Sequence, residues 1–156
     1  MRFRYPPEGV RANRSLGYLL HRAHKLARQR VEKVFEGKSL TLSQWIALSL
    51  LREGVATTPG EIAERLGHDT GATTRLVSRL EGLGLIDRAR STEDQRIVTL
   101  SLTAGGERSF TELSPAVSEI WNSMLAGFDR NEVEALIKLL GLFILRLEEP
   151  AIGRKR

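Results

Sequence analysis

The sequence predicts a mainly α-helical (α+β) fold that carries one short β-hairpin between its fourth and fifth helices. Apolar residues recur at three- and four-residue steps over most of the chain, which is the period of an amphipathic helix. After Gly84 the period changes to two, where alternating apolar residues indicate a pair of short strands. We therefore expect four helices, two strands and two further helices, in that order.

The first two helices are defined by apolar period and by a cap. The first is expected from about residue 14 to residue 36. The second follows Thr41, which stands three residues before Gln44 in the spacing of a capping box. In that motif each side chain binds a backbone N–H that the helix leaves unpaired. We expect this helix to end near Arg52, ahead of Gly54.

The third and fourth helices are short and close together. Thr58 is the predicted cap of the third helix, Pro59 takes its first position, and Glu61 completes a capping box. This helix should end at Gly67, and the fourth begins only a few residues later and stops at Gly84. The spacing is that of a helix-turn-helix.

The strands of the hairpin are expected over residues 85–90 and 96–103, joined by a charged loop at residues 91–95. Thr103 at the end of the second strand is the predicted cap of a long helix. The hairpin therefore follows directly on the helix-turn-helix.

Two long helices complete the chain. The first is expected over residues 104–126, with a kink or a break at Pro115 because proline lacks the N–H of the helical ladder. Asp129 and Glu132 form another capping box, which opens a last helix that runs to about residue 148.

The charge of the chain points to a polyanionic partner. The net charge is +5, and residues 1–38 hold ten Lys or Arg against three Glu, which gives +7 for this segment and −2 for the remainder. A basic arm of this kind can approach phosphates, although a solvated basic surface would have the same composition.

Cysteine usage and hydropathy limit the class of protein. The chain has no cysteine, so disulfides, thiolate metal sites and thiol redox sensing are excluded. The start of the chain lacks the apolar core of a secretory signal. The longest apolar stretch, residues 136–147, is too short to span a bilayer and contains Lys138 and Arg146. These features predict a soluble, cytoplasmic protein with no membrane partner.

The fourth helix, capped by Asp69 or Thr70, has two contrasting faces. An apolar stripe should face the core and consists of Leu76, Val77, Leu80 and Leu83. The other positions are small, hydroxylic or guanidinium groups of the kind that enter a major groove and bond to bases and phosphates. The candidate DNA contacts are Thr70, Thr73, Thr74, Arg75, Ser78 and Arg79. An ordinary amphipathic surface helix is the alternative.

The hairpin adds a second set of candidate contacts. An arginine at a thin β tip can reach into a minor groove, where narrow A·T tracts concentrate negative potential. Asp94 is placed to orient Arg96 through a charge-assisted pair. The candidate DNA contacts in this part of the chain are Arg88, Arg90, Ser91, Asp94 and Arg96. A solvated turn whose charges serve solubility is the alternative.

The chain resembles the multiple-antibiotic-resistance regulator (MarR) family of winged helix-turn-helix transcription factors over about residues 16–147. The resemblance rests on "LEGLGLIDR" before the hairpin, the pattern Asp94-x-Arg96, and "LTAGG" at its end. It implies that the fourth helix enters the major groove and that Arg96 enters the minor groove, positioned by Asp94. Gly71 and Ala72 depart from the family, which often has Ser and Thr at these positions.

The last helix predicts a dimer, because its apolar residues cover more than the one stripe that a surface helix needs. They are Val133, Leu136, Ile137, Leu139, Leu140, Leu142, Phe143, Ile144 and Leu147. Packing within one chain is the alternative to a two-fold dimer. We expect a single domain over residues 1–156, with a winged helix-turn-helix lobe at about 40–103 and dimerisation helices at about 12–38 and 104–149.

The expected function is that of a homodimeric, sequence-specific DNA-binding regulator of transcription. Two recognition helices of a dimer would lie roughly 34 Å apart and would read a pseudopalindromic operator. The family resemblance implies a repressor that a small aromatic or phenolic effector releases from double-stranded DNA. Candidate ligand-binding residues are Tyr18, His21, Trp45 and Trp121. The alternative for the aromatic residues is a place in the core.

Other classes of function have less support. His21 and His24 have a spacing that can hold a metal ion, but no third ligand stands beside them, so we predict no metal and no cofactor. A metal-responsive regulator and a winged-helix module that binds protein remain the alternatives. The sequence has no arrangement of nucleophile and base, no paired carboxylates and no phosphate-binding loop, so we predict no enzyme.

Overall fold

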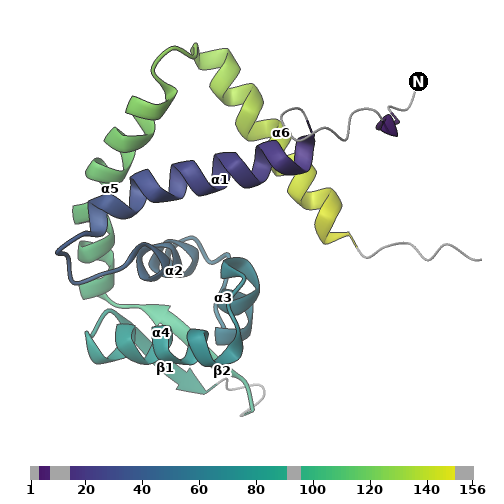
Figure 1. Ribbon diagram of the computed structural model, residues 1–156. Coiled ribbons are helices and arrows are strands. Elements are labelled where there is room, and N and C mark those ends of the chain that lie inside the picture. The colour runs from purple at the N-terminus through teal and green to yellow at the C-terminus, as the bar shows by residue number, and fades with distance from the viewer. Residues whose placement is uncertain (1–3, 8–14, 91–95, 150–156) are drawn as a thin grey trace, which may run out of the picture. The chain divides into compact units, whose positions relative to one another are not determined.

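The computed structural model describes residues 4–7, 15–90 and 96–149 (Figure 1). Its elements are α1 (Leu16–Glu32), the 3₁₀ turn η2 (Lys33–Phe35), α2 (Leu42–Arg52), α3 (Pro59–Leu66), α4 (Thr70–Gly82), β1 (Ile86–Arg90), β2 (Val98–Leu102), α5 (Ala104–Leu125) and α6 (Arg130–Glu148). The predicted fold class and the predicted order of helices and strands are confirmed.

The capping boxes form as the sequence predicts. At the start of α2, the Gln44 N–H donates to Thr41 Oγ1 at 3.3 Å, and the Thr41 N–H donates to Gln44 Oε1 at 2.9 Å. The same reciprocal pair joins Thr58 to Glu61 at the start of α3. These bonds satisfy backbone donors that have no partner within the helix, and they fix where each helix begins.

Two details differ from the prediction. The first helix stops being α-helical at Glu32 and tightens into η2, because the chain must turn towards α2. Helix α5 runs through Pro115, so the alternative of a break is wrong and the alternative of a kink stays a prediction. The buried side chains of Leu113 and Val117 flank this position and hold both sides of the proline against the core. Such packing can offset the loss of one hydrogen bond.

The core of the lobe lies between α2, α3, α4 and the hairpin, which are drawn together in Figure 1. Its largest fully buried side chains are Leu48, Ile62, Val77, Leu80 and Ile86. They come from each of these elements except β2, which contributes the buried Leu100. The helix-turn-helix and the hairpin therefore share one hydrophobic core.

Strands β1 and β2 pair antiparallel, with Ile86 opposite Leu102 and Arg90 opposite Val98. The backbone N–H of Leu100 also donates to the carbonyl of Thr57 at 2.7 Å. This bond attaches the hairpin to the segment that precedes α3. The hairpin is thus fixed to the helix-turn-helix by main-chain bonding as well as by its apolar side chains.

Gly106, the second of the two glycines that follow β2, lies where a side chain would not fit. A Cβ at this position would collide with the carbonyl oxygen of Leu85 and with the side chain of Leu102. Thr103 caps the same turn, accepting from the Gly106 N–H at 3.0 Å and donating to the Gly84 carbonyl at 2.8 Å. The start of α5 therefore lies against the start of β1, which only glycine permits.

The chain divides into two compact units, Met1–Ile120 and Trp121–Arg156, with the boundary inside α5. In the second unit no residue of α6 is buried, and the exposed fraction of its Ile137 is 66% and of its Leu147 68%. No helix within the described residues is long and apolar enough to cross a membrane.

Candidate nucleic-acid interface

Helix α4 is built with one buried and one exposed face. Asp69 caps it by accepting from the Ala72 N–H at 2.7 Å. Leu76, Val77 and Leu80 are buried, as the apolar stripe predicts, and Leu83 is half-buried. The helix is thereby held by one face and presents the other to solvent.

The exposed face carries most of the predicted contacts on this helix. The exposed residues are Thr70, Thr74, Arg75, Ser78 and Arg79. The Thr74 hydroxyl donates to the Thr70 carbonyl at 2.8 Å, which leaves its oxygen able to accept a further bond.

Thr73 is a correction to the predicted set. Its side chain is only 3% exposed, and its hydroxyl donates to the Asp69 carbonyl at 3.0 Å. Thr73 precedes Leu76, Val77 and Leu80 by three, four and seven residues, so it lies on the buried face. It cannot contact DNA from there, and we remove it from the candidate interface.

The hairpin places arginines beside this face. Arg90 ends β1 and Arg96 stands two residues before β2, and both are exposed. Arg88 Nη2 lies 3.1 Å from Glu81 Oε2 on α4, an ion pair that the sequence reasoning missed. Ser91 and Asp94 lie outside the described residues, so the orienting role of Asp94 stays a prediction.

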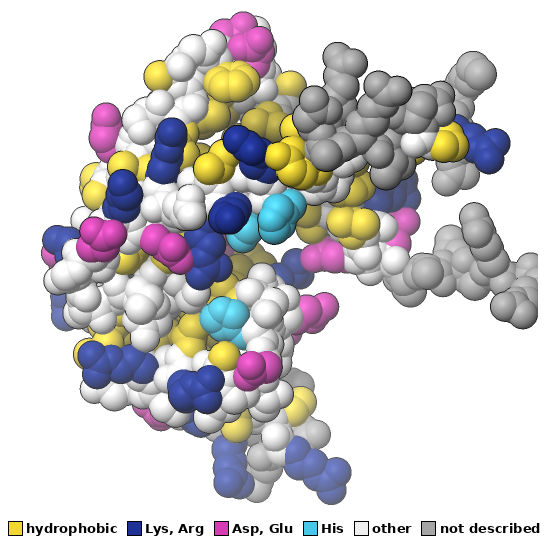
Figure 2. All heavy atoms as spheres, in the orientation of Figure 1, with side chains coloured by type: hydrophobic (Ala, Val, Ile, Leu, Met, Phe, Trp, Pro, Cys, Tyr) yellow, Lys and Arg dark blue, Asp and Glu magenta, His cyan; other side chains and the backbone are white. Residues whose placement is uncertain are grey.

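Figure 2 shows basic side chains, which are all arginines in this part of the sequence, over α4 and at the free end of the hairpin. Besides Arg88, the exposed arginines of this group are Arg75, Arg79, Arg90 and Arg96. A row of guanidinium groups on a helix and an adjoining β tip is suited to phosphates and to guanine acceptors. We call these four residues, with Thr70, Thr74, Ser78 and Arg88, the candidate DNA surface.

The Asp69 carboxylate that caps α4 has a lowered pKa. The hydrogen bond from the Ala72 N–H is the main cause that holds the pKa of Asp69 below its ordinary value. Desolvation acts in the other direction, and the charge of Arg75 and the Gly71 N–H lower the pKa further. A negative charge therefore stays at the N-terminus of the candidate recognition helix, where it also interacts favourably with the helix dipole.

The candidate ligand residues occupy different surroundings. Trp45 is half-buried: its indole N–H donates to the Phe110 carbonyl at 3.2 Å, and its ring stacks on that of Phe110 at 4.9 Å between centroids. Tyr18, His21 and Trp121 are exposed, and the Tyr18 hydroxyl accepts from Arg22 at 3.0 Å. Trp45 thus matches the alternative of a packing residue, and the ligand role of the other three stays a prediction.

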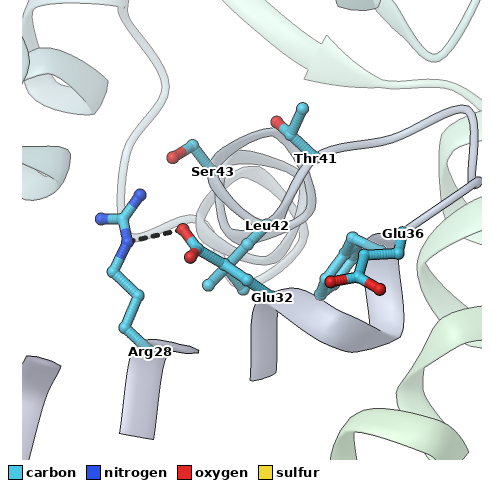
Figure 3. Close-up of a pocket in the computed structure, with 7 residues that line it drawn as sticks. Arg28, Glu32, Glu36, Thr41, Leu42 and Ser43 are labelled. Carbon is cyan, nitrogen blue, oxygen red and sulfur yellow. Dashed lines mark hydrogen bonds and ion pairs between the residues drawn. The ribbon is translucent and has the colours of Figure 1, made fainter. Parts of the chain in front are cut away.

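A cavity of about 250 Å³ lies between the end of α1, η2 and the start of α2 (Figure 3). It is lined by Arg28, Glu32, Phe35, Glu36, Thr41, Leu42 and Ser43. Arg28 Nε is bound to Glu32 Oε1 at 2.8 Å, and Thr41 is used as a helix cap. None of the four candidate ligand residues lines this cavity, and its two carboxylates are unsuited to an aromatic anion.

The histidines give no sign of a metal centre. His21 and His24 are both exposed on α1, and no group of three or more potential ligands gathers anywhere in the described part of the chain. His68, in the turn between α3 and α4, has a buried Nδ1 that finds no hydrogen-bond partner among the described residues.

Comparison with known proteins decides the family. A sequence model of the MarR family matches residues 38–97, which hold α2, the helix-turn-helix and β1 and end just before β2. The transcriptional regulator MgrA of Staphylococcus aureus is 33% identical over 117 residues, which are 75% of this chain and 78% of MgrA. The chain belongs to the MarR family.

Solved structures agree with this assignment. Apo MarR from E. coli is 26% identical, with a TM-score of 0.70 over 82% of this chain and 95% of MarR. BpsR from Bordetella bronchiseptica, whose DNA binding is regulated by 6-hydroxynicotinic acid, is 24% identical, with a TM-score of 0.69 over 82% and 97%. This MarR-family chain is therefore a DNA-binding transcriptional regulator and not an enzyme, as its sequence predicted.

Proposed function

We propose that this MarR-family regulator acts as a homodimer that represses transcription from a pseudopalindromic operator, and that a small aromatic or phenolic compound releases it. The observation that carries the proposal is the arrangement of α4. One face is anchored in the core, and the opposite face holds exposed Arg75 and Arg79 next to the arginines of the hairpin. A repressor of this type works in the compartment that holds the DNA.

In the proposed complex α4 lies in the major groove and the end of the hairpin lies over the adjacent minor groove. Arg75 and Arg79 would contact guanine edges or phosphates, and Arg96 would enter the minor groove. Most of the affinity would come from arginine–phosphate contacts with release of counterions, so binding should weaken steeply with salt.

The dimer is supported by α6. Nine of its apolar side chains are exposed in the single chain: Leu136, Ile137, Leu139, Leu140, Leu142, Phe143, Ile144, Leu145 and Leu147. A contiguous apolar surface of this kind is expected to be covered by another chain, and a second copy gives a closed two-fold assembly. Two copies would place two recognition helices about one turn of DNA apart.

The proposal that the effector is a small aromatic or phenolic compound is supported only by the similarity of this chain to BpsR. BpsR responds to 6-hydroxynicotinic acid, a small aromatic acid. We extend this class to the present chain, with Tyr18, His21 and Trp121 as the candidate contacts. The absence of cysteine leaves a bound ligand, and not thiol oxidation, as the signal.

Two claims, that the operator is pseudopalindromic and that the protein binds it as a dimer, can be tested together by selecting bound sequences from randomised DNA duplexes. We expect an inverted repeat with half-site centres about ten base pairs apart, and sedimentation of two chains for each bound duplex. Replacing both Ile137 and Ile144 with Glu, seven residues apart on α6, should give a monomer that loses the operator. Asn131→Glu, at the exposed start of the same helix, is the control. A wild-type protein that sediments as a monomer at micromolar concentration would contradict the proposal.

A further inference from the structure

The first turn of α4 contains an unusual juxtaposition around Gly71. A Cβ built on this glycine would lie 3.3 Å from Asp69 Oδ1 and 3.5 Å from Arg75 Nη1. The Arg75 guanidinium therefore folds back along the helix towards its N-terminus, and the bare backbone of Gly71 lies between it and the capping carboxylate. Both side chains belong to the exposed face of the helix.

This position of Arg75 needs an electrostatic explanation. The N-terminus of a helix carries a partial positive charge, so a guanidinium group near it is disfavoured. The Asp69 carboxylate lies at the same place and supplies the opposite charge. The pKa of Asp69 is lowered mainly by the hydrogen bond from the Ala72 N–H, and the charge of Arg75 adds to this lowering, which agrees with an attraction between the two side chains.

We propose that Asp69 is a positioning residue for Arg75, that Gly71 provides the space for this arrangement, and that the three residues together make Arg75 select guanine at one position of each half-site. The proposal rests on the proposed function, in which α4 enters the major groove. An arginine held in one direction can bond to guanine O6 and N7 together, whereas a freely rotating arginine contacts phosphates and bases of any kind.

The second observation behind the proposal is that a glycine occupies position 71 within the helix. The φ of this glycine is not positive, so its backbone does not require glycine, and glycine within a helix is less stable than alanine. A methyl group here would press on Asp69 Oδ1 and touch Arg75 Nη1. The glycine therefore destabilises the helix slightly while keeping the space between cap and arginine open.

The test compares base preferences, because a purely structural role would not change them. Operators are selected from randomised duplexes with the full-length wild type and with the Asp69→Asn, Gly71→Ala and Arg75→Ala variants. Asparagine caps helices as well as aspartate does, so Asp69→Asn removes the charge and keeps the cap. We expect Arg75→Ala to abolish the preference for G·C at one position of the half-site. Asp69→Asn and Gly71→Ala should weaken it about five- to tenfold at that same position.

Two matched controls isolate the effect. Asp129→Asn makes the same change at the cap of α6, and Gly82→Ala makes the same change on α4, where a Cβ meets nothing within 4 Å. Both controls should select the wild-type operator. Circular dichroism at the assay temperature verifies that each variant is folded.

The inference and the proposed function fail in different ways. Arg75→Ala could abolish the base preference at one position of the half-site while Asp69→Asn and Gly71→Ala leave that preference unchanged. In that case the positioning role is wrong and the proposed DNA surface stands. If Arg75→Ala binds and selects as the wild type does, Arg75 is not a DNA contact, and both the inference and this part of the proposed function are overturned.

Discussion

Arg88 on β1 and Glu81 on α4 form an ion pair, with Arg88 Nη2 3.1 Å from Glu81 Oε2. The pair joins the hairpin to the candidate recognition helix on the side that we assign to DNA. Both side chains are more than a third exposed, at 35% and 44%, so the pair adds at most about 1 kcal/mol to stability. Its consequence for DNA binding is larger, because it places a carboxylate among arginines that would contact phosphates.

Glu81→Gln should therefore tighten DNA binding. The change removes a negative charge from the interface and frees Arg88 to contact a phosphate, so we expect the Kd at low salt to fall by roughly two- to fivefold. Fluorescence anisotropy on the selected operator measures this. Glu134→Gln, which breaks the Arg130–Glu134 pair on α6, is the control and should leave the Kd unchanged. Weaker binding by a fully folded Glu81→Gln protein would contradict our description of the pair.

Gly106→Ala should destabilise the lobe. The added Cβ meets the Leu85 carbonyl and the Leu102 side chain, and backbone cannot move aside as a flexible side chain can. Overpacking of this kind lowers the free energy of unfolding by about 1–3 kcal/mol. Urea denaturation at fixed protein concentration measures it. Gly82→Ala, where the Cβ meets open space, should be neutral or stabilising, and an equal loss in both variants would refute the close approach.

The Glu61 carboxylate should make the free energy of unfolding of the lobe depend on pH. Hydrogen bonds from the backbone N–H groups of Thr57 and Thr58 lower the pKa of Glu61 below its ordinary 4.5. The ionised Glu61 therefore contributes fully to stability when the pH is above the pKa that Glu61 has in the unfolded chain. This contribution is lost as the pH falls through the lower pKa that Glu61 has in the folded protein. The difference in unfolding free energy between wild type and Glu61→Gln should shrink as the pH drops from 6 to 3. A difference that stays constant over this range would show that the charge has no role.

The stack of Trp45 on Phe110 should hold α2 against α5. Arg52 adds to it, since its guanidinium carbon lies 5.2 Å from the Phe110 ring centroid and its Nε is 2.8 Å from Glu107 Oε1. We expect Phe110→Leu to cost about 1–2 kcal/mol of unfolding free energy.

The same variant has a spectroscopic signature. In a Trp121→Phe background the emission of Trp45 should shift to the red, because water reaches the indole ring. Phe128→Leu, at a side chain that is 56% exposed, is the control and should change neither emission nor stability appreciably. Unchanged emission in the Phe110→Leu protein would contradict the stack.

Much of the fold was predictable because its signals are local. Thr41, Thr58 and Asp129 each start a helix through a bond to a residue three positions along the chain, and such spacings can be read directly. The change of period after Gly84 located both strands to within a few residues. The buried stripe of α4 followed from helical spacing alone, and that same spacing should have placed Thr73 on the buried face.

What the sequence did not reveal depends on contacts between elements. The pairing of Arg88 with Glu81 requires the hairpin to lie on α4, and the stacking of Trp45 on Phe110 joins residues 65 positions apart. Helix α5 continues through Pro115, where the sequence predicted a kink or a break, because burial on both sides of the proline overrides local propensity.

The central claim is that α4 and the hairpin bind DNA, and Arg96→Ala tests it most directly. Anisotropy on the selected operator, over a series of salt concentrations, compares this variant with the wild type and with Arg130→Ala, an arginine of α6 outside the candidate DNA surface. We predict that wild type and Arg130→Ala bind alike and weaken steeply with salt, whereas Arg96→Ala binds about tenfold or more weakly and still sediments as a dimer. An Arg96→Ala protein that binds as tightly as the wild type at every salt concentration would contradict the account.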